Sequence, residues 1–186
     1  MNRRFEDMER CIHLGRQQDD GSLLELTALL KNDDWRIRFA AAVALGDRAD
    51  PRSIEPLLDL LRAEDAAPLY SQSGDLSSAP AGAPNAGQLT FPEGTTAATR
   101  AAWERRGRLK QSACIALGRI GSADERVLEF LHRYSTDAKE DYAVRAAAAK
   151  ALGVLRNPLS RPFLVVAAQD EEWCTKTEAR KALTAL

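Results

Sequence analysis

The residues best suited to chemistry form one basic cluster in the middle of the chain. Within residues 100–110 a single acid, Glu104, stands among basic and aromatic side chains, namely Arg100, Trp103, Arg105, Arg106, Arg108 and Lys110. Arginines contact phosphates and an aromatic ring between them stacks on bases, so this composition could bind nucleic acid. However, a helix would spread these side chains around its circumference, and the whole chain has a net charge of −1. We therefore expect the cluster to be a solvated face or one that pairs with a loop; if it binds a partner, an acidic protein surface is favoured over nucleic acid.

The sequence lacks the common catalytic and metal-binding motifs. It has no glycine-rich phosphate loop, no His-Glu-x-x-His and no Cys-x-x-Cys. We expect structural roles for the two histidines, His13 and His132. Cys11 and Cys114 stand where the repeat described below has small residues, which predicts buried thiols in a reducing cytoplasm. We therefore expect no catalytic, cofactor-binding or metal-binding residues, no cofactor and no enzymatic activity.

A repeated segment organises the rest of the chain. Residues 33–46 read DDWRIRFAAAVALG, and residues 140–153 read EDYAVRAAAAKALG. A third copy occupies residues 107–118, a fourth without the closing glycine occupies residues 171–183, and a faint fifth ends at Gly15. Most of these copies are separated by 31 or 35 residues. A period of this length is typical of solenoids built from two-helix repeats.

Each repeat is predicted to contain an A helix followed by a B helix. Apolar residues recur at helical spacing in the repeated segment, and the closing glycine suits a left-handed helix end, so we expect the A helices to stop at Gly46, Gly118 and Gly153. The B helices are expected at residues 22–30, 52–62, 124–134 and 159–169, the last with the apolar residues Phe163, Leu164, Val166 and Ala167. The expected N-cap residues are Asp50, Ser122 and Asn157.

Charged residues inside the A helices have the spacing of helical ion pairs. An acid precedes a base by four residues in Asp34–Arg38, Asp141–Arg145 and Glu172–Lys176. This is the favourable order along a helix, and each such pair stabilises it by about 0.3–0.5 kcal/mol. We expect these pairs to form a solvated ladder on the helix surface.

Residues 66–98 interrupt the repeat with a segment rich in proline, glycine and serine. This composition cannot form a packed helix pair, and inserted loops of this length are usually functional or disordered. A helix is expected to follow at residues 97–117. The candidate partner-binding residues are apolar residues of the insertion together with part of the basic cluster, namely Leu69, Tyr70, Leu76, Leu89, Phe91, Trp103, Arg105, Arg106 and Arg108.

Two segments carry a resemblance to a known family. RIRFAAAVALG at residues 36–46, followed by DPRSIEPLL at residues 50–58, resembles a HEAT repeat and is most similar to the short bacterial HEAT-like repeats of the phycobilin-lyase type. The resemblance covers residues 1–62 and 107–186. It implies an all-α fold, an α-solenoid of about four to five two-helix HEAT-like repeats with one long loop insertion, whose B helices line the concave face.

The resemblance implies less about activity than about fold. Most members of the family hold other macromolecules, some attach or remove bilins, one branch is an iron hydroxylase and another binds damaged DNA. The hydroxylase branch needs repeated His-Glu pairs to ligate its metals, and this sequence has none of them.

Three functions stay open at this point. The favoured one is a non-catalytic scaffold or adaptor that docks a partner protein on the concave B-helix face, on the 66–98 insertion, or on both. The second is a phycobilin-lyase-like protein that handles a bilin or the protein that carries it. The third is nucleic-acid binding through the cluster at residues 100–110.

Residues 1–186 are expected to form one solenoid domain in the cytoplasm. Met1–Arg10 is charged and has no apolar segment of the kind found in signal peptides, and no apolar run approaches the ~18 residues of a transmembrane helix. We expect the helix at residues 171–183 to cap residues 140–169 and the protein to be a monomer, with a dimer through that helix as the alternative.

Overall fold

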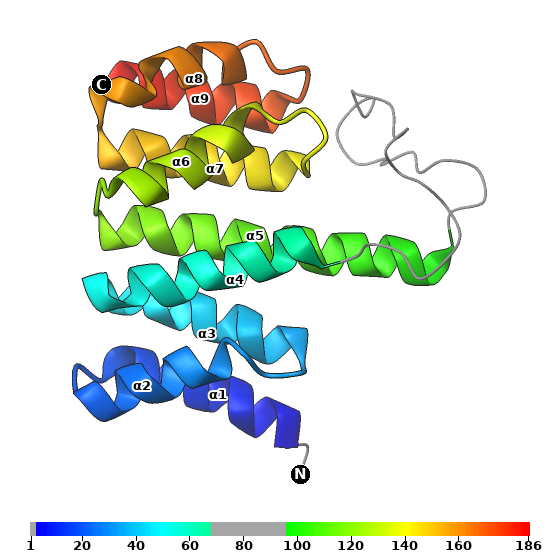
Figure 1. Cartoon of the computed structure of the whole chain (residues 1–186), viewed down its shortest axis with the longest axis vertical. Helices are drawn as coiled ribbons and strands as arrows, with labels where there is room; N and C mark the ends of the chain where they lie inside the picture. The colour runs from blue at the N-terminus through cyan, green and yellow to red at the C-terminus, as the bar shows by residue number, and fades with distance from the viewer. Residues whose placement is uncertain (1–2, 68–95) are drawn as a thin grey trace.

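The computed structural model describes residues 3–67 and 96–186, and within them the chain is helical, with no strand. Five helices lie side by side in one layer (Figure 1). These A helices are α1 (Arg3–Arg16), α3 (Trp35–Arg48), α5 (Ala97–Ile120), α7 (Tyr142–Leu155) and α9 (Trp173–Ala185). The predicted all-α solenoid is thereby confirmed.

The second layer consists of the B helices, which alternate with the A helices along the chain. They are α2 (Asp20–Leu29), α4 (Ile54–Ala66), α6 (Glu125–Thr136) and α8 (Arg161–Ala167). Short 3₁₀ turns, η1 (Pro51–Ser53) and η3 (Pro158–Ser160), precede α4 and α8. In Figure 1 the B helices lie in front of the A helices, and the repeats follow one another along the long axis of the molecule.

The glycine of each repeat is a packing residue, so its prediction as a helix end is wrong. Gly46, Gly118 and Gly153 lie inside α3, α5 and α7. A Cβ atom added to any of them would come within 3.0 Å of an alanine in the next A helix: Ala116, Ala151 and Ala182 respectively. Gly15 of α1 meets Ala44 in the same way, at 3.0 Å. Glycine is required here because two helix backbones approach each other too closely for a side chain.

The helices end a few residues further on, in a left-handed conformation. Ala49 and Arg156 have φ angles of 55° and 50°, and Gly121 has a φ of 76°. Asp50 and Asn157 cap the following B segments as predicted, each accepting a hydrogen bond from the backbone N–H two residues later. The third cap is Asp124 instead of Ser122, because the turn between α5 and α6 is longer.

The core lies between the two layers and matches the repeat register. Leu45, Leu117 and Leu152 are buried at equivalent positions of α3, α5 and α7. Cys11 and Cys114 are buried as expected, and burial raises the pKa of the Cys11 thiol to about 11. Burial also raises the pKa of Cys114. Both thiols are therefore poor nucleophiles near neutral pH.

Arginines of the repeated A-helix segment pair with acids near the end of the following B helix or in the turn after it, which differs from the predicted ladder of i, i+4 pairs. Arg145 Nε and Nη2 donate to Asp170 at 2.8 and 3.0 Å, and Nη1 donates to the Glu140 carbonyl. Arg38 likewise donates to the carbonyl of Asn32 at 2.8 Å and pairs with Glu64. The acids of the repeated segment cap helices instead: Asp34 and Asp141 are the N-cap residues of α3 and α7.

Helix α4 is longer than predicted at the insertion, because it continues to Ala66, whereas α5 begins at Ala97 as predicted and continues to Ile120. Both ends of the 66–98 segment are therefore helical. Five candidate residues lie outside the described residues, namely Leu69, Tyr70, Leu76, Leu89 and Phe91. With 24 residues against 14 in α3 and α7, helix α5 projects past its neighbours (Figure 1). At the C-terminal end of the stack, α9 packs on α7 and α8, as predicted for the capping helix.

Replacing Gly46 by alanine tests the close approach of α3 and α5. Helix propensity alone predicts that Gly46→Ala stabilises α3 by about 1 kcal/mol. The new Cβ would lie 2.7 Å from Ala116 Cα, however, and this backbone atom cannot move without shifting α5. We expect a net loss of roughly 1–3 kcal/mol in the free energy of unfolding, measured by urea denaturation.

Gly21→Ala is the matched control, because Gly21 is exposed and the nearest atom is a side-chain oxygen of Asp19 at 3.1 Å. It should change the stability much less. An increase in stability for Gly46→Ala would contradict the packing role of this glycine.

Candidate functional site

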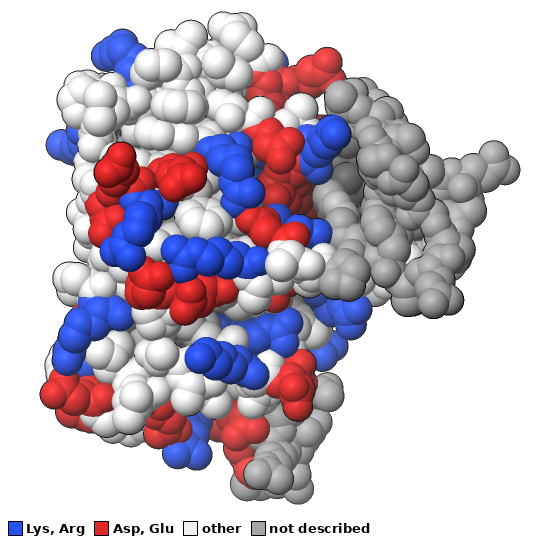
Figure 2. Space-filling view, in the orientation of Figure 1, with Lys and Arg blue, Asp and Glu red and all other residues white. Residues whose placement is uncertain are grey.

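Charged side chains of both signs interleave on the B-helix layer (Figure 2). Arg52 of η1 reaches Asp20 of α2, with 2.7 Å between Nη1 and Oδ1, and Arg126 of α6 reaches Glu55 of α4, with 2.5 Å between Nη1 and Oε2. Because these pairs are exposed and screened by solvent, each adds little to the stability of the fold. They link successive B helices and leave a hydrated, mixed-charge surface.

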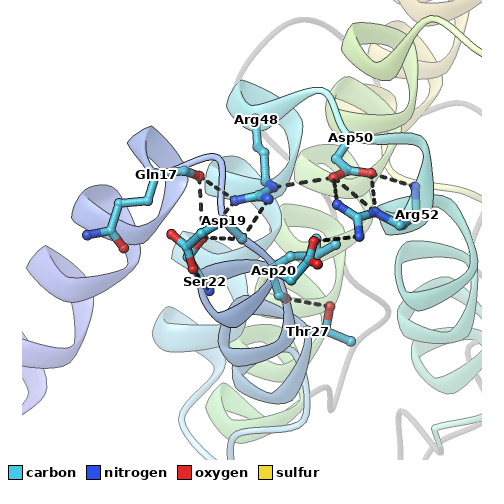
Figure 3. Close-up of polar contacts among 9 residues, drawn as sticks. Gln17, Asp19, Asp20, Ser22, Thr27, Arg48, Asp50 and Arg52 are labelled. Carbon is cyan, nitrogen blue, oxygen red and sulfur yellow. Dashed lines mark hydrogen bonds and ion pairs between the residues drawn. The ribbon is translucent and has the colours of Figure 1, made fainter.

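The first two repeats are joined by a buried arginine at the back of this surface (Figure 3). Arg48 donates to the Asp19 carbonyl at 2.8 Å, to Ser22 Oγ at 2.7 Å and to the Gln17 carbonyl. These contacts satisfy the backbone of the turn between α1 and α2. Next to them, hydrogen bonds from Arg52 lower the pKa of Asp50 to about 2. Arg48 therefore has a structural role and is not available to a ligand.

A second polar network lies where α4, α5 and α6 meet. Lys110, whose side chain is only 3% exposed, places Nζ 2.6 Å from Asp65 Oδ1 and 2.5 Å from Glu140 Oε2. Asp65 also accepts hydrogen bonds from Tyr134, at 2.9 Å, and from Arg133. Burial disfavours the Asp65 carboxylate, but these donors outweigh it and lower its pKa. The carboxylate thus stays charged and paired, which suits a structural network better than a general acid or base.

The structure divides the predicted basic cluster between two environments. Trp103 and Arg106 line a pocket of about 270 Å³ beside the Asp65 network, and Arg106 donates to the Asp65 carbonyl at 3.1 Å. Arg105 and Arg108 are exposed on another side of α5. The cluster therefore does not form one continuous basic face. This agrees with its helical spacing, which predicts that the side chains spread around the circumference of α5.

A groove on the B-helix layer was not predicted from the sequence. It lies between α2 and α4 and encloses about 660 Å³, with Leu30, Pro56, Leu60 and Ala63 among its apolar walls and Arg38 and Glu64 among its polar ones. A smaller pocket of about 270 Å³ lies in the A-helix layer between α1 and α3. Both arise from the spacing of neighbouring repeats, which no single segment of the sequence encodes.

The histidines take different positions. His13 is exposed and pairs with Gln17 at 3.1 Å, because no described helix covers that side of α1. His132 is half-buried: its ring stacks on Phe163 at 3.9 Å between centroids, and Nε2 is 2.9 Å from Ser160 Oγ. Burial lowers the pKa of His132. Neither histidine pairs with an acid or a cysteine in the described contacts.

The part of the chain that the structure describes has neither a metal-binding cluster nor a membrane-spanning helix. Within residues 3–67 and 96–186, no group of three or more His, Cys, Asp or Glu side chains is placed to hold a metal ion. In the same part of the chain, no helix has the length and apolar character needed to span a membrane.

Stacked A–B helix pairs with this register define an α-solenoid. The profile of HEAT repeats matches residues 9–72 and 97–184, so the chain belongs to the HEAT-repeat family. Among solved structures, human deoxyhypusine hydroxylase in complex with glycerol matches with 18% identity and a TM-score of 0.41, over 96% of this chain and 78% of that one. A similarity this low carries no argument about function. The search of curated protein sequences found no match.

Asp65→Asn tests the buried network. The substitution removes a charged partner from Lys110, so we expect a loss of about 3 kcal/mol in the free energy of unfolding at pH 7. Since folding lowers the pKa of Asp65 below its usual value of 3.8, its charge stabilises the fold above that pH, and the contribution is lost as the pH falls through the lower folded value. Chemical denaturation between pH 7 and pH 2 should therefore show wild type and variant converging in acid.

Asp59→Asn is the control, because Asp59 forms an exposed pair with Arg62 and should contribute no more than about 1 kcal/mol. Equal losses for the two variants would show that the Asp65 network is no more than a surface ion pair.

Proposed function

We propose that this protein is a non-catalytic scaffold that docks a partner protein on its B-helix face. The observation that carries the proposal is the groove of about 660 Å³ between α2 and α4, whose walls combine apolar residues with charged ones. Protein-binding surfaces have this mixed composition, with an apolar centre and a polar rim. The exposed ion pairs around the groove leave the face open to water, which is consistent with reversible docking.

The A-helix face supports docking less well. Its pocket between α1 and α3 is smaller, at about 270 Å³, and its helices are packed backbone to backbone at the glycine–alanine contacts. The insertion at residues 66–98 stays a second candidate element for the same partner. Bilin handling and nucleic-acid binding have no specific observation in their favour, and they are treated as outcomes of the experiment below.

Site-specific photo-crosslinking in the native host tests the proposed face. A benzophenone amino acid would replace Leu24 of α2, Arg62 of α4 or Leu159 of η3 on the B-helix layer, and Ile12 of α1 or Val154 of α7 on the A-helix layer. We expect the B-layer positions to crosslink to the same protein and the A-layer positions to give none. Crosslinks from the A-layer positions alone would contradict the proposed face.

Two further readouts separate the competing functions. Crosslinked nucleic acid, or affinity for it that persists at physiological salt, would favour the basic cluster of α5. A visible chromophore that co-purifies with the chain would favour bilin handling. We expect neither.

A further inference from the structure

The ion pairs that link one B helix to the next stop at α8. Positions can be counted from the N-cap residues Asp50, Asp124 and Asn157. Two residues after the cap stand Arg52, Arg126 and Leu159, and nine residues after it stand Asp59, Arg133 and Val166. In the first two segments these residues form ion pairs, among them Arg126 with Glu55 and Arg133 with Asp65. In the third segment the same positions are apolar.

The change from charged to apolar residues in the third segment does not result from a shift of the helix register. Seven residues after the cap stand Leu57, Leu131 and Leu164, and all three are buried. Ten residues after it stand Leu60, Tyr134 and Ala167, which are buried as well. The core-facing side of η3–α8 thus follows the other B helices, and only the outward side differs.

The apolar residues on that outward side are exposed. Leu159 is 71% exposed, Phe163 37% and Val166 57%. From the sequence, the last two were expected only as apolar residues of this B helix. Their i, i+4, i+7 spacing places them on one side of the segment, over about 10 Å of helix axis. Figure 2 shows a largely uncharged surface over α8, in contrast to the charged surface over α2, α4 and α6. We call Leu159, Phe163 and Val166 the α8 patch.

Contacts with α6 hold the α8 patch in position from below. Phe163 lies flat on His132 of α6, with an angle of 5° between the rings, and Ser160 holds the imidazole by a hydrogen bond of 2.9 Å. Val166 of the patch also lines an adjoining pocket of about 330 Å³ between α6 and α8, together with Ala138, Thr136 and Glu171. An apolar side chain of a partner could enter this pocket without rearrangement of the helices.

Glu129, on the neighbouring edge of α6, lacks the cationic partner that the equivalent acid of α4 has. Five residues after the cap stand Glu55 in α4 and Glu129 in α6. Glu55 receives Arg126 from the following segment, but the equivalent of Arg126 in the next one is Leu159. Within the described residues Glu129 forms no ion pair, and it is exposed. A partner that covers Leu159 can supply the missing positive charge.

We propose that the α8 patch binds an amphipathic helix of the partner protein. Apolar residues of that helix at i, i+4 and i+7 lie on Leu159, Phe163 and Val166, and an arginine or lysine beside them pairs with Glu129. This inference rests on the proposed docking function and adds the place and chemistry of the docked segment. Helix-in-groove recognition depends on the same combination of apolar anchors and flanking charge.

A designed peptide tests this directly. The probe is a fluorescein-labelled, alanine-based helix of about 16 residues with leucines at i, i+4, i+7 and i+11 and arginines along one flank, compared with a scrambled peptide of the same composition. Fluorescence anisotropy is measured with the full chain. We expect Val166→Asp to weaken binding at least tenfold and Glu129→Gln to weaken it severalfold. Exchanging the peptide arginines for glutamate should make the Glu129→Gln effect disappear.

Each variant has a matched control on the same chain. Val154 of α7 has the same residue type and the same 57% exposure as Val166, so Val154→Asp should leave binding unchanged. Glu125 is an exposed acid of α6, one turn before Glu129, and Glu125→Gln should have little effect. Circular dichroism verifies that all variants are folded. Equal affinity for the scrambled peptide, or an unchanged affinity for Val166→Asp, would overturn the proposal.

Two results separate this inference from other readings of the surface. A dimer in analytical ultracentrifugation that is lost on Val166→Asp would assign the patch to a second copy of the chain and overturn the partner helix. Photo-crosslinks from positions 24 and 62 without any from position 159 would overturn the α8 patch as the docking place, while the proposed function would stand.

Discussion

The structure depends on the close approach of neighbouring A helices at glycine–alanine contacts. Gly15, Gly46, Gly118 and Gly153 each face an alanine of the next A helix so closely that an added Cβ atom would lie only 2.7–3.0 Å from it. Because the same pair recurs at each step, successive repeats stack in the same way and the B helices form a regular second layer. The arrangement of groups on that layer follows from this spacing, including the groove between α2 and α4.

Charged residues then connect the repeats in two ways. Buried or half-buried cations of the A helices hold the ends of B helices and the turns that follow, as Arg145 does with Asp170 and the Glu140 carbonyl. Exposed pairs such as Arg126 with Glu55 join one B helix to the next. The first kind fixes the fold, whereas the second is weakly stabilising and can be exchanged. The α8 patch, where apolar residues replace the second kind, is therefore compatible with the same fold and leaves the surface available for recognition.

The sequence predicts the helices and their order well, because the repeat supplies the register several times over. It predicts their contacts less well. The glycines fit a helix end by residue type, and only the neighbouring helix shows that they are packing positions. Arg38 and Arg145 have an acid four residues before them, yet their partners come from elsewhere: Glu64 lies near the end of α4, and Asp170 lies in the turn after α8. Periodicity within one helix does not encode which helix lies opposite.

The candidate site was likewise predicted from the sequence only in part. Helical spacing predicted that the basic cluster of α5 would be split, and Trp103 and Arg106 do lie apart from the exposed Arg105 and Arg108. Phe163 and Val166 were predicted only as apolar residues of a B helix, whereas Asp59 and Arg133, the exposed equivalents of Val166, show that its position faces solvent.

Hydrogen–deuterium exchange with the purified natural partner tests whether docking occurs on the B-helix layer. We expect added protection in the B helices, greatest in α6 and α8, whereas protection confined to the A-helix layer would contradict docking on the B-helix layer.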